Sequence, residues 1–267
     1  MFKYFLRRLL EMIPKIIILS VIIFTLLQFV PGDPLSYQIS PDQMSKLSPE
    51  AIERMRDALG LNDPAPLRYL KWAKGVCTGN LGYSLVSGTA ITQLIAARLP
   101  ATVELLIFSF IIATTLGIVF GYVSAVKRNT PIDYILTTLG MVGVSVPEFF
   151  FGLCAIVIFC FKLKLLPSGG RSPIGDTSFV ARIPYMVMPV MVLGLSYIAV
   201  LMRYTRSAML DVMNKEYIKA SRAKGLTDTQ VNIKHVFRNA LIPVMIILVN
   251  RIPILISGAV VIESVFN

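Results

Sequence analysis

The side chains that could carry out acid–base, nucleophilic or metal chemistry are scarce in this sequence of 267 residues. His235 is the single histidine, and the three cysteines are Cys77, Cys154 and Cys160. A catalytic triad needs a histidine beside a nucleophile, and a structural metal site needs several histidine or cysteine ligands. The G-x-x-x-x-G-K-S/T phosphate-binding loop of ATPases is also missing. We therefore predict a chain that is not an enzyme and binds no metal or cofactor of its own.

Two charged residues interrupt long apolar stretches and are the first candidates for a functional role. Glu148 follows Pro147, and Arg251 follows Asn250, each near the middle of an apolar run. A charged side chain at the centre of a bilayer costs about 3 kcal/mol or more, so such residues usually have a function. These four residues are candidates for a translocation path. The alternative is that Glu148 and Arg251 form a structural ion pair, within the chain or with a partner subunit.

A third candidate is the segment 206–225, which combines many charges with a few apolar side chains and predicts a helix that Gly225 ends. Thr227 and Gln230 then have the spacing of a capping box, which starts a second helix that is expected to run through His235 into the last apolar run. Connections between bundle helices usually need about 2–8 residues. A segment of this length is better explained as an interface with another protein than as a solvated connector.

The elements that must position these residues are predicted to be membrane helices in an all-α protein. Apolar residues make up 55% of the chain and charged residues 15%, and the mean hydropathy is +0.71. This composition excludes a soluble domain, a disordered chain and a small disulfide-bonded scaffold. A bilayer core needs about 20 apolar residues per helix. Five transmembrane helices are predicted, at 9–30, 101–126, 134–161, 183–202 and 240–261.

Two of these runs carry further signals. Pro147 is expected to kink the third helix, because it cannot donate a backbone hydrogen bond. Gly117 and Gly121 form a GxxxG pattern in the second, which predicts close packing against another helix.

The positive charge of the chain indicates its orientation in a membrane. Lys and Arg number 26 against 15 acidic residues, a net charge of +11. They gather at the N-terminus, after residue 126 and over 203–238, so the positive-inside rule explains them better than nucleic-acid binding. The N-terminus is therefore predicted to be cytoplasmic, and Asn267 to lie outside.

The loop 31–97 is predicted to be external and to contain two short amphipathic helices. Ser48 and Pro49 open the first, which Gly60 ends, and the second lies near residues 67–73. The pair either rests on the membrane surface or docks an external partner.

Several segments resemble the permeases of ABC importers, in order along nearly the whole chain. EYIKASRAKG at 216–225, followed by RNALIP at 238–243, resembles the EAA loop of that family. Further segments resemble its peptide-importer branch: RRLL (7–10) with Pro14, PGDP (31–34), LGL (59–61), GNLGYS (79–84), RLPATVE (98–104), SVPEFFFGL (145–153), LPSGG (166–170) and ESVFN (263–267).

The resemblance implies the type I ABC-importer permease fold and a place in the bacterial plasma membrane. The chain would pair with a second, similar permease, with two cytoplasmic ATPases that bind ATP and Mg, and with an external binding protein that delivers peptides. The residues implied to couple the chain to an ATPase groove are Glu216, Lys219, Ala220, Ser221, Arg222, Ala223, Lys224 and Gly225. Members of the branch also carry glutathione, nickel complexes and some sugars; peptides are favoured here.

The expected organisation is a first transmembrane helix at 1–30, the external loop at 31–97 and a permease core at 98–267 that includes the coupling loop 206–238. Members of the family usually continue into a sixth span, so we expect that this chain is truncated before it; a native form with five spans is the alternative. The alternative function is a secondary transporter driven by an ion gradient. Such a carrier would predict inverted repeats and acidic midplane sites, whereas the sequence has no evident repeat and only Glu148 as a central carboxylate.

Overall fold

The computed structural model describes residues 2–30, 35, 46–58, 60–84, 86–176 and 178–266. Within these residues the chain forms helices joined by turns, with one isolated β-bridge between Tyr83 and Ala90, which confirms the predicted all-α class. Two compact units are present, Met1–Arg98 and Leu99–Asn267. The motif at 31–34, together with Leu59 and Asn267 from two other motifs, lies outside the described residues.

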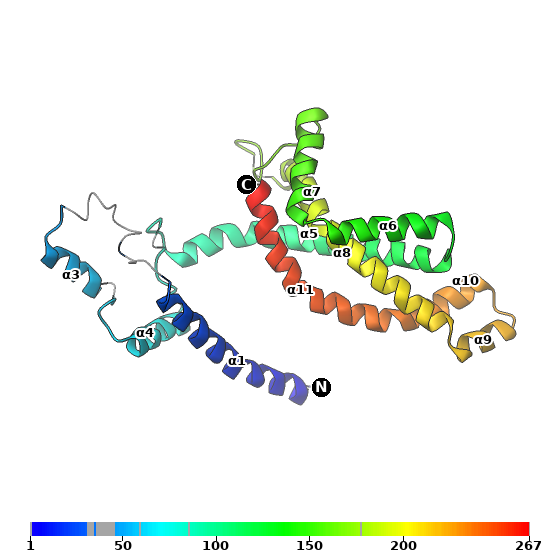
Figure 1. Ribbon diagram of the computed structural model, residues 1–267, viewed down its shortest axis with the longest axis horizontal. Coiled ribbons are helices and arrows are strands. Elements are labelled where there is room, and N and C mark those ends of the chain that lie inside the picture. The colour runs from blue at the N-terminus through cyan, green and yellow to red at the C-terminus, as the bar shows by residue number, and fades with distance from the viewer. Residues whose placement is uncertain are drawn as a thin grey trace. The chain divides into compact units, whose positions relative to one another are not determined.

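The first unit contains α1 (Phe2–Gln28), α3 (Pro49–Ala58), α4 (Ala65–Cys77) and the start of α5 (Figure 1). Ser48 caps α3 as predicted, because its Oγ accepts a hydrogen bond from the backbone N–H of Ala51 at 3.2 Å. Gly60 follows the helix with a φ of 67°, a left-handed conformation that glycine adopts at low cost. The second predicted outer helix is present as α4 and extends beyond the predicted 67–73 at both ends.

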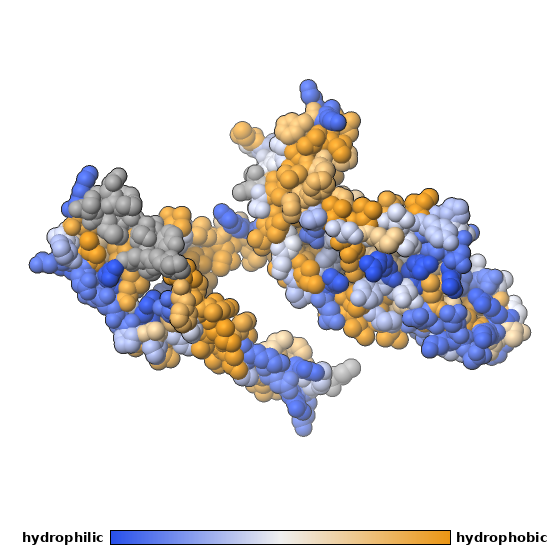
Figure 2. All heavy atoms as spheres, in the orientation of Figure 1, coloured by the Kyte–Doolittle hydropathy of each residue, from blue (hydrophilic) through white to orange (hydrophobic). Residues whose placement is uncertain are grey.

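Helix α4 packs against the C-terminal half of α1. The hydroxyl oxygens of Tyr69 and Ser20 lie 2.9 Å apart, and the ring of Phe24 lies 5.4 Å from that of Tyr69 and 6.5 Å from that of Trp72. Ser20 and Phe24 are one helical turn apart and therefore share a face of α1. No residue of α1 is buried, and its apolar surface is visible in Figure 2, as is typical of a helix that faces lipid.

The second unit contains the rest of the chain. Its elements are α5 (Ile91–Val126, which begins in the first unit), α6 (Pro131–Ser145), α7 (Glu148–Ala155), the π-helical η2 (Ile156–Lys162), α8 (Phe179–Met213), α9 (Glu216–Ala223), α10 (Asp228–Gln230), the π-helical η3 (Val231–Phe237) and α11 (Arg238–Phe266). In Figure 1, α5 and α6 form a hairpin beside α8, and α9 and α10 lie beyond the end of α8.

Four helices of the described chain are long and apolar enough to cross a membrane: Phe2–Gln28, Ile91–Val126, Phe179–Met213 and Asp228–Phe266. A fifth span is present if the pair Pro131–Ser145 and Glu148–Lys162 crosses together, although its two halves are bent by 103°. The single kinked helix predicted at 134–161 is therefore wrong. Val146 and Pro147 are extended, with ψ values of 131° and 139°. A proline disfavours the helical conformation in the residue before it, which accounts for the extended backbone of Val146 and the end of α6.

Helix α8 is the most buried of the four long helices, and α5 packs closely on it. The buried residues of α5 are all small: Ser109, Ala113, Gly117, Gly121, Ser124 and Ala125. A Cβ atom built on Gly117 would lie 2.7 Å from Cβ of Leu201, which is closer than real Cβ contacts, so the backbones meet only because residue 117 is glycine. The close packing predicted from the GxxxG pattern is confirmed.

Candidate functional site

The segment 206–238 begins as the end of α8 and then changes direction. Helix α8 ends at Met213, Asn214 and Lys215 form a turn, and α9 begins at Glu216. The backbone N–H of Lys215 donates to the carbonyl oxygen of residue 212 at 3.0 Å, which closes the last turn of α8. The continuous helix predicted over 206–225 is therefore wrong.

Two buried side chains give the physical reason for this break. Met209 on α8 and Ile218 on α9 are both fully buried, in one cluster with Val231 and Val236 of η3. The separation of nine positions (218 minus 209) is about two and a half helical turns, so on one straight helix the two side chains would point to opposite sides. The turn between the helices lets both reach the same cluster.

Helix α9 is anchored to the rest of the chain by one side chain. Ile218 is its single buried residue, and Ser221 is half-buried. The remaining residues of the helix are exposed: Glu216, Tyr217, Lys219, Ala220, Arg222 and Ala223. The part of the molecule that contains α9 and α10 is largely hydrophilic in Figure 2. The residues singled out from the sequence thus form an open face of small and charged side chains.

The charged residues of this face make local contacts only. Lys219 Nζ lies 2.8 Å from Glu216 Oε1 on the same helix, and Arg222 Nε lies 3.3 Å from Oδ1 of Asp228 at the start of α10. All four side chains are nearly half exposed or more, so each pair contributes little to stability, typically about 0–1 kcal/mol. These side chains can therefore change partners at low cost.

The connection from α9 to α10 has the local structure that the sequence predicts. Gly225 has a φ of 82°, and its N–H donates to the carbonyl oxygen of Arg222 at 2.9 Å. The Thr227 Oγ1 accepts a hydrogen bond from the backbone N–H of Gln230 at 3.4 Å, and the Gln230 Oε1 accepts one from the N–H of Thr227 at 3.1 Å. Both halves of the capping box are therefore present. From Asp228 the chain stays helical into α11, as expected.

The first pair of candidates within the spans lies at the bend between α6 and α7. Pro147 is exposed, and Glu148 is half-buried at the first position of α7. Ser196 Oγ of α8 donates a hydrogen bond to Glu148 Oε1. A Cβ atom on Gly258 of α11 would lie 2.9 Å from Glu148 Oε2, so this glycine provides the space for the carboxylate. Three helices therefore hold Glu148 in place.

The second pair lies on α11, where Asn250 is exposed and Arg251 is half-buried. Among the described residues no acidic side chain lies within ion-pair distance of Arg251, so the pair with Glu148 considered above is not formed. One turn after Arg251, the backbone N–H of Leu255 donates a hydrogen bond to the hydroxyl oxygen of Tyr197 on α8. Tyr197 was not a candidate from the sequence, because a tyrosine in an apolar run gives no signal of its own.

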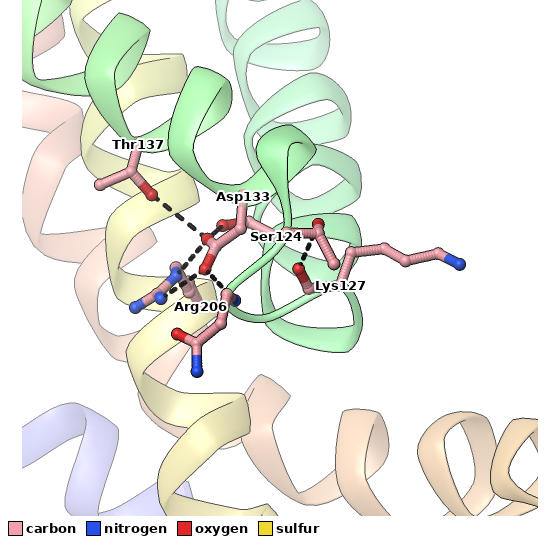
Figure 3. A network of polar contacts seen from close by, with 7 residues as sticks. Ser124, Lys127, Asp133, Thr137 and Arg206 are labelled. Carbon is pink, nitrogen blue, oxygen red and sulfur yellow. Dashed lines mark hydrogen bonds and ion pairs between the residues drawn. The ribbon is translucent and has the colours of Figure 1, made fainter.

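Sequence reasoning also missed a buried carboxylate, Asp133 near the start of α6 (Figure 3). Its side chain is 3% exposed and pairs with Arg206 of α8, with Nε 2.8 Å from Oδ1 and the second guanidinium nitrogen 2.8 Å from Oδ2. The available signal was weak: an acidic residue in the first turn after Pro131, which is a common helix start.

A second ion pair of this type joins α5 and α8 near the other end of α8. Arg182 lies 2.7 Å from Oε2 of Glu104, and Arg171 of the preceding loop lies 3.6 Å from the same oxygen. The Glu104 and Arg182 side chains are 17% and 21% exposed. Groups of His, Cys, Asp and Glu suited to a metal ion are not found in the described part of the chain.

Comparison with known proteins gives matches over both parts of the chain. A family model described as "Binding-protein-dependent transport system inner membrane component" matches residues 117–267. A second model, for the N-terminal part of such membrane components, matches residues 1–106.

Individual relatives align along the full length of the chain. A protein of Brucella suis biovar 1 named as a peptide permease is 37% identical over 269 aligned positions, which cover 100% of this chain and 84% of the relative. The oligopeptide transport system permease protein AppB of Bacillus subtilis is 38% identical with the same coverage. A Sinorhizobium fredii protein named as a peptide ABC transporter permease, y4tP, is 31% identical over 99% of this chain and 83% of its own length. These matches favour an importer permease over a carrier driven by an ion gradient.

Proposed function

Because the chain belongs to the family of binding-protein-dependent transport system inner membrane components, and is thus a multi-pass permease subunit of an ABC importer, we propose that it forms a peptide translocation path together with a second, similar permease. An external binding protein delivers the peptide. Two ATPase subunits on the cytoplasmic side bind ATP with Mg and supply the energy, since the chain has no phosphate-binding loop of its own.

The observation that carries the coupling part of this proposal is the exposed face of α9. A helix with one buried anchor, Ile218, and exposed small residues at Ala220 and Ala223 can enter a groove on another protein. Glu216, Lys219, Arg222 and Lys224 are exposed around these alanines and are placed to make charged contacts at the rim. Gly225 sets the direction in which the chain returns to α10.

The path part of the proposal concerns the polar residues within the spans. Pro147 breaks the helix and leaves Glu148 at the start of α7, and interrupted helices are a common source of polar groups at transport sites. Asn250 is exposed on α11, and Arg251 has no acidic partner among the described residues. We assign these four residues to the path, where Arg251 faces the peptide or water.

The proposed location is the bacterial plasma membrane, with the N-terminus and residues 206–238 in the cytoplasm. Lys and Arg at the N-terminus and in the segment 206–238 support this orientation. The helices α3 and α4 then lie outside, where they rest on the membrane surface or meet the binding protein.

The coupling role is tested by Ala220→Glu in the assembled complex of both permeases and both ATPases. A buried carboxylate at the groove should weaken the contact, so fewer ATPase subunits should co-purify with the permeases, and peptide uptake into proteoliposomes should fall. Ser207→Glu is the matched control, because it adds the same charge at an exposed position on α8 outside α9. If Ala220→Glu retains the ATPases and transports at the wild-type rate, α9 is not the coupling element.

A further inference from the structure

Asp133 is a buried carboxylate, and each of its two oxygens accepts more than one hydrogen bond. Besides Arg206, its Oδ1 accepts hydrogen bonds from Ser124 Oγ at 2.5 Å and Thr137 Oγ1 at 3.3 Å, and its Oδ2 accepts one from the backbone N–H of Asn129 at 3.0 Å (Figure 3). These groups belong to the end of α5, the following turn, α6 and α8. One buried carboxylate therefore ties the α5–α6 hairpin to the middle helix of the unit.

Close backbone packing reinforces this connection. A Cβ atom on Gly121 of α5 would lie 2.5 Å from Cβ of Thr205, and one on Gly143 of α6 would lie 3.1 Å from Cβ of Ala199. Thr205 and Ala199 both belong to α8. If the hairpin slid along α8, the backbones of α5 and α6 at these glycines would meet larger side chains of α8, so the close packing limits sliding. The ion pair then fixes the position of the hairpin along α8.

The same stretch of α8 is packed against the proposed coupling element. Met209, one turn beyond Arg206, is fully buried against Ile218 of α9 and residues of η3. Ala125 at the end of α5 belongs to this cluster too, and the ring of Tyr122 meets that of Phe237 at 5.6 Å and 88°. The ends of α5 and α8, together with α9 and η3, thus form one continuous packed body.

We propose that Asp133 and Arg206 are positioning residues for transport, which make the α5–α6 hairpin move with α8 and α9 as one rigid body. When an ATPase displaces α9, helix α6 and the bend at Pro147 would then be displaced together with it. This inference rests on the proposed function, because it assumes that an ATPase binds α9 and moves it.

The chemistry of the pair suits such a role better than apolar packing would. A guanidinium that bonds both carboxylate oxygens is fixed in orientation as well as in distance, which lysine cannot reproduce. A half-broken pair would leave a buried charge without its partner, so intermediate positions of α6 on α8 are strongly disfavoured. The hairpin is therefore either seated on α8 or displaced from it.

The first test is Asp133→Asn in the assembled complex, reconstituted in proteoliposomes. The ATPases should remain bound, because α9 keeps its anchor and its exposed face. Peptide transported per ATP hydrolysed should fall about fivefold or more, the lower end of usual coupling between distant sites. Glu104→Gln is the matched control, since it neutralises another carboxylate that forms an ion pair with an arginine of α8 but lies near the opposite end of that helix. It should leave the ratio of peptide to ATP unchanged.

The second test replaces the ion pair by a covalent link. A Cβ atom on Gly143 would lie 3.1 Å from that of Ala199, so the two positions need to separate by only about 0.4 Å to reach the Cβ–Cβ distance of a disulfide, about 3.5–4.5 Å. Both can be changed to cysteine after Cys77, Cys154 and Cys160 are replaced by serine. With the disulfide formed, Gly143→Cys/Ala199→Cys should transport at the rate of its reduced form, because a rigid body tolerates an internal crosslink. The same crosslink should restore coupling to Asp133→Asn, and reduction should abolish the rescue.

The two proposals fail in different ways. If Asp133→Asn keeps the wild-type ratio of peptide to ATP, or if the disulfide blocks transport, the hairpin and α8 do not move as one body, and the coupling role of α9 is unaffected. If Ala220→Glu is silent, the proposed coupling by α9 fails whatever the disulfide does. A parallel loss of ratio in Glu104→Gln would mean that any weakening of the α5–α8 packing uncouples transport, and this would overturn a special role for Asp133.

Discussion

The hydroxyl oxygen of Tyr197 accepts a hydrogen bond from the backbone N–H of Leu255 at a distance of 3.0 Å. Both residues are buried, at 5% and 2% exposed, and they join α8 to α11 two positions after Pro253. The Tyr197 side chain thus binds a backbone N–H of α11 close to Pro253, which lies inside that helix. Leu255 lies one turn after Arg251 on α11, and Ser196, the residue before Tyr197, donates a hydrogen bond to Glu148. The contact therefore joins the helix that carries Arg251 to the helix that binds Glu148.

Tyr197→Phe should therefore destabilise the bundle. The change removes one oxygen and leaves a buried N–H without that partner, which costs about 1–3 kcal/mol. We expect a lower thermal midpoint for the purified protein in detergent. Tyr204→Phe on the same helix is the control, since Tyr204 is 44% exposed and should tolerate the change. Equal midpoints for the two variants would contradict the prediction.

The glycines of the α5–α8 contact should differ sharply in their tolerance of alanine. At Gly121 a Cβ atom would lie 2.6 Å from the backbone oxygen of Met202, which cannot move away alone, so Gly121→Ala should cost about 1–3 kcal/mol through overpacking. At Gly194 the nearest atoms lie 3.7 Å and 3.8 Å away, which is ordinary contact. Gly194→Ala should be neutral or stabilising by up to about 1 kcal/mol. Thermal midpoints of the two variants measure the difference.

Gly225 should be sensitive to backbone conformation and not to size. Nothing lies within 4 Å of the Cβ position, so a larger residue meets no atoms there, but a φ of 82° is strained for residues with a side chain. Gly225→Val should cost about 1–2 kcal/mol locally and reduce retention of the ATPases and uptake together. Gly225→Asn, which tolerates the left-handed conformation, should retain most activity. An equal loss of ATPase retention and uptake in both variants would indicate that the ATPase contact requires a position 225 without a side chain.

Arg251→Leu should separate a role in the path from a role in the fold. The guanidinium has no ion-pair partner among the described residues, and a charge in the bilayer is costly, so its removal should not lower the amount of inserted protein or its thermal midpoint. Peptide uptake per complex should fall, whereas Arg251→Lys should keep part of it. A loss of inserted protein with normal uptake per remaining complex would assign Arg251 to the structure instead.

Cysteine labelling should report the proposed orientation. Position 50 on α3 and position 222 on α9 are both suited to it, because the side chains of Glu50 and Arg222 are 86% and 46% exposed. In a background without the three native cysteines, an impermeant reagent added to intact cells should label Glu50→Cys. It should label Arg222→Cys only after the membrane is opened. Labelling of position 222 in intact cells would reverse the orientation.

The local features of this fold were largely predictable from the sequence. Apolar runs of sufficient length identify four spans directly, and the capping pattern of Thr227 and Gln230 identifies the start of the last one. Gly225 was predictable because few residues other than glycine adopt a left-handed conformation at a helix end. These features depend only on residues that are close together in the sequence.

The features that depend on distant packing were not predictable in the same way. Charged residues on both sides of Asn214 continue the helical pattern, and only the shared burial of Met209 and Ile218 reveals the turn. Asp133 and Arg206 are separated by 73 positions, so nothing local connects them. Pro147 indicates a break in the third run, but the angle of 103° depends on how α7 packs against α8 and α11.

The single anchor of α9 has a consequence for how such permeases diverge. Since Ile218 is the single buried residue of this helix, mutations at the exposed positions of α9 leave the fold almost untouched. The surface that contacts an ATPase can therefore change during evolution through a series of variants that all remain folded. Two importers descended from one ancestor could thereby cease to exchange subunits within the same cell. A graft of residues 216–223 that keeps isoleucine at position 218 should transfer the choice of ATPase from one permease to another.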